Sequence, residues 1–119
     1  MTKMLSLRIT ETHKFCIESC LKVQKITKND IVLKAIARFW KRESEIEELG
    51  FDNHERLLPE RITIKLPDDI YLKVKKYSED KNKSVSAVIR IALNILIWSV
   101  IEANADKSMS ELFQNFRID

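Results

Sequence analysis

The stretch RITIKLPDD, residues 61–69, alternates branched apolar side chains with basic or hydroxyl-bearing ones and then reaches a proline and two aspartates. Apolar residues at every second position are typical of a half-buried strand. The inner face of this strand would consist of Ile62, Ile64 and Leu66. The outer face would consist of Arg61, Thr63 and Lys65. Pro67 suits a helix start and aspartates are favourable at the positive end of a helix dipole, so we expect the strand to lead directly into a helix.

The same pattern occurs a second time when the chain is shifted by 57 residues. LSLRI at residues 5–9 then lies over ITIKL at residues 62–66, with like residues paired at every position. The polar face of this first strand would consist of Met4, Ser6 and Arg8. The match continues downstream, with Thr27 over Ser84 and Ile31 over Val88. Matching residues at one fixed shift are the signature of an internal repeat, so we interpret the chain as a duplicated unit.

Each strand is followed by two predicted helices. The first helix of each copy would run to about Lys25 and to about Lys81, and the second would span residues 28–49 and 85–104. Thr10, Thr27 and Ser84 are N-cap candidates, and Asn82 suits a left-handed residue that ends a helix. The inward residues of the first helices would be Ile17, Cys20 and Leu21 in copy one, and Ile70, Val74 and Tyr77 in copy two.

The last long helix, residues 85–104, is apolar nearly all round and carries only a thin polar stripe. That stripe consists of Ser86, Arg90 and Asn94. A helix of this kind is expected to be the buried centre of a fold. A short C-terminal helix is also predicted, because Ser108 and Glu111 form a capping box ahead of an apolar stripe.

These elements predict a mostly α fold with a short antiparallel β-ribbon, in the order β-α-α-β-α-α. The expected parts are residues 1–49 as the first unit, 50–60 as an acidic connector, 61–104 as the second unit and 105–119 as a helical tail, all sharing one core. The net charges of residues 1–42, 43–60, 61–90 and 91–119 are +7, −6, +4 and −2. Two basic blocks separated by acidic ones favour polyanion-binding surfaces.

The strand, helix, turn and helix order, with RITIKLPDD followed by NKSVSAVI at residues 82–89, resembles the ribbon-helix-helix superfamily of the MetJ, Arc and CopG type. The resemblance covers residues 4–44 and 61–102, and copy one lacks the usual glycine-containing turn. It implies DNA binding, in which the outer strand residues read base edges in the major groove. The base readers would be Arg61, Thr63, Lys65, Ser6, Arg8 and Met4. It also implies phosphate anchoring at the starts of the second helices, by Ser84, Val85, Ser86, Lys83, Thr27, Lys28 and Asn29.

Several other classes of protein are disfavoured. The single glycine, Gly50, leaves no material for a phosphate-binding glycine loop, so we expect no nucleotide cofactor. His13, Cys16 and Cys20 could share a helix face, but core packing of the two thiols is the favoured interpretation and we expect no metal. We find no catalytic constellation and predict a protein that is not an enzyme. The longest uncharged run has 11 residues, so we expect a cytoplasmic protein without a membrane span.

The favoured function is that of a DNA-binding transcriptional regulator, a repressor of viral or plasmid type, with double-stranded DNA as its partner. The alternatives are a DNA-processing accessory protein of a plasmid, of relaxosome or partition type, and an oligomerisation or antitoxin-type interaction module. The two ribbon strands could pair within one chain as a pseudo-dimer, since the ten-residue connector 51–60 spans up to ~33 Å, or between two chains. The resemblance implies cooperative assembly on DNA in either case.

Overall fold

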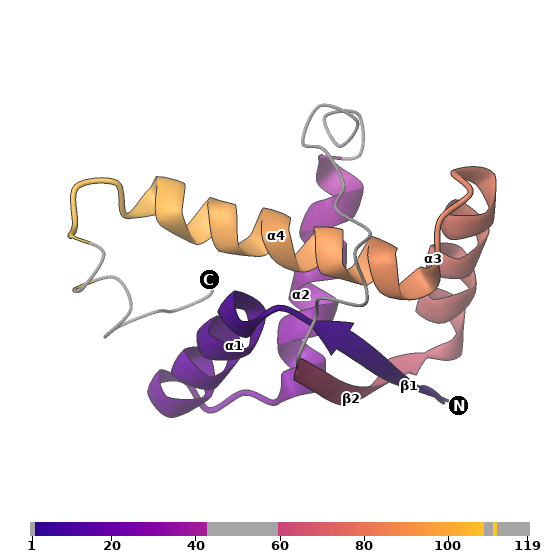
Figure 1. Cartoon of the computed structure of the whole chain (residues 1–119), viewed down its shortest axis with the longest axis horizontal. Helices are drawn as coiled ribbons and strands as arrows, with labels where there is room; N and C mark the ends of the chain where they lie inside the picture. The colour runs from indigo at the N-terminus through magenta and orange to yellow at the C-terminus, as the bar shows by residue number, and fades with distance from the viewer. Residues whose placement is uncertain (1, 43–59, 109–110, 112–119) are drawn as a thin grey trace.

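A computed structural model describes residues 2–42, 60–108 and 111 of the chain. The elements are β1 (Thr2–Ile9), α1 (Glu11–Val23), α2 (Lys28–Lys41), β2 (Glu60–Pro67), α3 (Asp68–Asp80) and α4 (Val85–Ala103) (Figure 1). This confirms the predicted fold class, a mostly α protein with one two-stranded antiparallel ribbon and the order β-α-α-β-α-α. The predicted helix of the tail lies mostly outside the described residues, although the Glu111 amide donates to the Ser108 hydroxyl at 3.2 Å.

The ribbon pairs β1 with β2 of the same chain in a register that runs from Thr2 opposite Pro67 to Ile9 opposite Glu60. Ser6 lies opposite Thr63, and these two residues are also the ones that the 57-residue shift superimposes. The shift also places Arg8 over Lys65 and Met4 over Arg61. It therefore exchanges the cross-strand pair Arg8–Arg61 with the cross-strand pair Met4–Lys65. A pseudo-two-fold axis through the central Ser6–Thr63 pair therefore relates the two strands of the ribbon.

The helix starts and stops follow the expected side-chain chemistry. Thr10, Thr27 and Ser84 each occupy an N-cap and accept a hydrogen bond from the backbone amide three residues ahead, as predicted. Asn82 has φ of 56°, and the Lys83 amide donates to the Ser78 carbonyl at 2.8 Å. This six-to-one bond closes α3 in the manner of a Schellman motif, with asparagine at the left-handed position.

One hydrophobic core joins both units, with α4 at its centre. Ten residues of α4 are buried, and the helix crosses α2 (Figure 1). The inner face of the ribbon contributes Leu7, Ile9, Ile64 and Leu66, all at most 1% exposed. By length and composition α4 could also cross a membrane, but 56% of its most apolar window is buried inside the protein, as in a core helix. The central position predicted for this helix is confirmed.

Four boundaries or faces differ from the sequence prediction. α2 ends at Lys41, with Arg42 as its C-cap, whereas the prediction extended it to residue 49. Pro67 occupies the N-cap of α3 with φ of −54° instead of the first helical position, because it still belongs to β2. β2 itself begins one residue earlier than predicted, at Glu60. Leu21 is exposed, since the buried stripe of α1 consists of His13, Cys16, Ile17 and Cys20.

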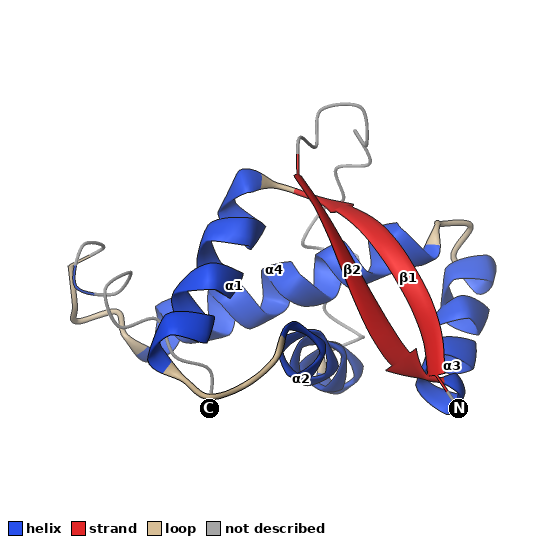
Figure 2. Ribbon diagram, turned by 90° about the horizontal axis from the view of Figure 1, so that it is seen from below, coloured by secondary structure: helices blue, strands red, loops and turns tan. Residues whose placement is uncertain are grey.

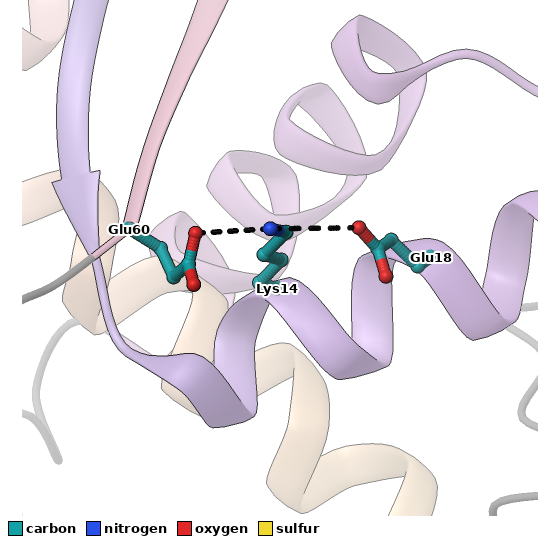
Figure 3. Close-up of polar contacts among 3 residues, drawn as sticks. All are labelled: Lys14, Glu18 and Glu60. Carbon is teal, nitrogen blue, oxygen red and sulfur yellow. Dashed lines mark hydrogen bonds and ion pairs between the residues drawn. The ribbon is translucent and has the colours of Figure 1, made fainter.

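Polar contacts connect α1 to the start of β2. The Lys14 ammonium lies 3.0 Å from the Glu60 carboxylate at the start of β2 and 4.0 Å from Glu18 on the next turn of α1 (Figure 3). The hydrogen bond with Glu60 is the main reason that the pKa of Lys14 is raised. These groups are half-exposed, so the network orients α1 against the ribbon end more than it stabilises the fold.

Candidate nucleic-acid interface

The outer face of the ribbon consists of three cross-strand pairs. Met4 lies opposite Lys65, Ser6 opposite Thr63, and Arg8 opposite Arg61. All six side chains are exposed, and Met4 keeps 60% of its surface accessible. Seen from below in Figure 2, the ribbon lies in front of α4 and no described helix covers its near face. The structure thus brings the six predicted base readers together on one open surface.

The two ends of this surface differ in chemistry. We call the end formed by Arg8 and Arg61 the arginine end, and the end formed by Met4 and Lys65 the lysine end. The pseudo-two-fold axis exchanges them, so each arginine has a counterpart: Lys65 for Arg8 and Met4 for Arg61. Like charges directly opposite on neighbouring strands repel each other, and only the arginine end has such a pair.

The start of α2 flanks β2 at the lysine end. The Asn29 side-chain oxygen accepts a hydrogen bond from the Lys65 backbone amide at 2.9 Å, which fixes the helix to the strand edge. The Thr27 amide donates to the Asp30 carboxylate at 2.9 Å, and these hydrogen bonds lower the pKa of Asp30. The anion-binding capacity of this helix start is therefore partly used by Asp30, while the exposed Lys28 remains beside it.

The start of α4 flanks β1 at the arginine end and has no such carboxylate. Ser84 caps the helix by accepting from the Ala87 amide at 3.0 Å, and Ala87 is the counterpart of Asp30. Val85, Ser86 and Lys83 are each partly exposed. The predicted phosphate-anchoring residues thus lie on both sides of the ribbon, but the α4 start is the more favourable of the two for an anion.

A hollow with a volume of about 240 Å³ lies between the arginine end and the first turns of α4. Its lining consists of Ser6, Arg8, Arg61, Ser86 and Arg90. Arg90 is only 5% exposed and donates from Nη1 to the Arg8 carbonyl oxygen at 3.1 Å. Sequence reasoning placed Arg90 in the polar stripe of α4 without a role. The 57-residue shift places Arg90 over Leu33 of the first unit. An arginine in the place of an apolar residue, at an otherwise matching position, could have indicated a role for Arg90.

The residues considered for metal binding are engaged in packing. The Thr10 amide donates to Nδ1 of His13 at 3.3 Å, so Nε2 carries the proton and donates to Asn94 Oδ1 at 2.6 Å. Burial raises the pKa of Cys16 to about 11 and of Cys20 to about 12, which keeps both as thiols. Among the described residues, no group of three histidine, cysteine or acidic side chains could hold a metal ion. His54 lies outside that part of the chain.

No protein-family model, curated protein or solved structure matches this chain. The order of elements and the antiparallel pairing of β1 with β2 are compatible with a tandem ribbon-helix-helix arrangement.

Proposed function

We propose that this protein binds double-stranded DNA sequence-specifically and regulates transcription by inserting the β1–β2 ribbon into the major groove. The observation that supports this most is the exposed outer face, where six side chains able to contact bases form three cross-strand pairs. A two-stranded ribbon is narrow enough for the roughly 12 Å wide major groove. The four described helices lie on the other face of the ribbon or beside it, so none of them blocks the approach of a duplex (Figure 2).

The chemistry of the six side chains matches the edges of base pairs. Arginine and lysine donate to guanine O6 and N7, and the methyl group of threonine packs on the methyl group of thymine. Because the arginine end and the lysine end differ, the two halves of the ribbon would read different half-sites. The expected target is an imperfect palindrome or a direct repeat, and not a symmetric operator.

The flanking helix starts support the same placement. The first turns of α2 and α4 lie on opposite edges of the ribbon, as the contacts of Asn29 with Lys65 and of Arg90 with Arg8 demonstrate. Backbone amides at a helix start bind phosphate groups, and phosphate contacts set the register of a protein on a duplex. Lys28 and Lys83 would add affinity that weakens as salt increases.

The test is duplex binding by the double variant Arg61→Ala with Lys65→Ala at two salt concentrations. Loss of one base contact at each end is expected to weaken binding to a selected site by about 100-fold or more, since each contributes roughly 1–3 kcal/mol of discrimination. The matched control is Lys75→Ala with Lys76→Ala, which removes two positive charges from the exposed surface of α3. The control is expected to lose far less affinity.

Target sequences come from selection of bound duplexes from a random pool, followed by footprinting. Unchanged affinity in the ribbon double variant would overturn the groove model and favour an oligomerisation module built on the same fold. A strictly palindromic footprint would overturn the assignment of different half-sites to the two ends.

A further inference from the structure

We propose that the hollow between the arginine end and α4 binds one phosphate group, and that Arg90 is a ligand-binding residue. This inference deepens the proposed function and rests on it for the DNA source of the phosphate. The hollow itself is defined by five residues from three elements, β1, β2 and α4. No carboxylate belongs to its described lining, whereas three arginines do.

The arrangement of the three arginines favours an anion between them. Arg8 and Arg61 are directly opposite on adjacent strands, a placement that is destabilising for like charges unless a negative group lies between or beside them. Neither forms an ion pair with another described residue. The bond from Arg90 to the Arg8 carbonyl oxygen holds a third guanidinium against the same strand. Arg90 is only 5% exposed and still lines the hollow, so its guanidinium is held in place beside Arg8 and Arg61.

The shape and the donors fit phosphate better than a carboxylate. Guanidinium groups bind phosphate oxygens with two parallel hydrogen bonds, and three of them around one hollow suit the several oxygens of a tetrahedral group. Ser6 and Ser86 add hydroxyl donors, and Ser86 lies in the first turn of the 19-residue helix α4, where the helix dipole is positive. The phosphate could belong to the DNA backbone or to a small phosphorylated compound.

The lysine end contains the counterpart positions but not the same donors. Leu33 replaces Arg90, Met4 replaces Arg61, and Asn29, which is bonded to the Lys65 amide, replaces Ser86. The phosphate site therefore belongs to one end of the ribbon. A bound duplex would be anchored more firmly at that end.

The experiment compares the wild-type chain with Arg90→Leu, which copies the residue of the first unit, and with the control Lys76→Leu, which removes one exposed charge from α3. In the first arm, inorganic phosphate is titrated at constant ionic strength while the arginine Nε–H signals and the Ser86 amide are followed by NMR. Phosphate is expected to shift these signals in wild type and in Lys76→Leu but not in Arg90→Leu. Arg61→Gln, at an exposed position, repeats this arm should Arg90→Leu fail to fold.

In the second arm, duplex binding is measured over a range of salt concentrations. Arg90→Leu is expected to lower the affinity about tenfold and to reduce the salt slope by about one, as for loss of one phosphate contact. A reduced slope assigns the site to DNA phosphate. Phosphate-induced shifts without a change in the salt slope assign the site to a small phosphorylated compound. If the same shifts occur but the protein binds no duplex, the proposed function is overturned while the phosphate site stands. If neither the shifts nor the change in slope occurs, the phosphate site is refuted, although duplex binding would stand.

Discussion

The two ends of the ribbon share one internal design and differ in what they present to the outside. Toward the core, Leu7 and Ile64 occupy equivalent positions and are each 1% exposed. Toward the solvent, the arginine end has Arg8 and Arg61 with Arg90 behind them, and the lysine end has Met4 and Lys65 with Leu33 in the place of Arg90. The two strands therefore have the same packing toward the core, while their exposed faces differ. A side chain on the outer face can change without cost to the core, because alternate residues of a strand point to opposite faces.

The helix starts beside the two ends differ in the same sense. At the lysine end, the Asp30 carboxylate completes the cap of α2 and places a negative charge there. At the arginine end, the counterpart Ala87 leaves the start of α4 without a charge of its own. Charge and helix dipole thus both favour anion binding at one end.

The largest effect is expected for substitutions in the core, where the two strands have equivalent packing. Leu7→Ala and Ile64→Ala should each lower the free energy of unfolding by about 2–5 kcal/mol, because each removes buried methyl groups from the shared core. Chemical denaturation of both variants measures this, with Thr63→Ala on the outer face as a control that should change little. A much smaller loss for one of the pair would mean that the two halves are packed differently.

A smaller effect is expected when the outer faces are made alike. The pseudo-two-fold axis exchanges positions 4 and 61, and the variant Met4→Arg places an arginine at both. The new arginine would lie opposite Lys65, whereas Arg61 lies opposite Arg8. The selected DNA site should then become more palindromic, with a preference for guanine at the altered position of about 1–3 kcal/mol. Selection from random duplexes with wild type and variant in parallel measures the shift. An unaltered site preference would show that Met4 does not face the bases.

The smallest expected effect concerns pH and exists in one half only. His13 is 3% exposed and burial lowers its pKa, while its counterpart in the second unit is the apolar Ile70. In the unfolded chain this histidine takes up a proton near pH 6.5, whereas in the folded chain it does so only at lower pH. The contribution of neutral His13 to the free energy of unfolding is therefore complete above pH 6.5 and is lost as the pH falls toward the folded pKa. Thermal melts from pH 7.5 to pH 5 should register the loss. His13→Gln keeps a capping-box residue without the titration and should flatten the profile; an equally steep decline in that variant would assign it to other groups.

Much of the fold could be predicted because local patterns and tertiary structure agree. Alternation with a period of two placed Arg61, Thr63 and Lys65 on the face opposite Ile64, and the structure has the same division. The caps at Thr27 and Ser84 depend on contacts within four residues, which sequence spacing specifies. The apolar circumference of α4 required a central position, which it has.

The features that escaped prediction depend on contacts between distant segments. Arg90 reaches the ribbon because α4 passes beside β1, and no local pattern predicts a bond between residues 82 positions apart in the sequence. The buried state of His13 depends on Asn94, again from α4, and on a capping box in which histidine replaces glutamate. With His13 on the buried stripe, the stripe ends at Cys20 and Leu21 turns outward. The spatial exchange of Arg61 with Met4 across the axis could be recognised only from the register of the two strands, which the sequence repeat alone does not give.

The pairing of β1 with β2 inside one polypeptide has a genetic consequence. In a ribbon made from two identical chains, a single codon change alters both strands at once, so the two half-sites are bound to change together. Here one codon alters one strand. In the proposed DNA complex, a mutation would therefore change recognition at one half-site while the other is retained. Closure of the ribbon is also a unimolecular step, so its melting temperature should not depend on how much of the protein is present.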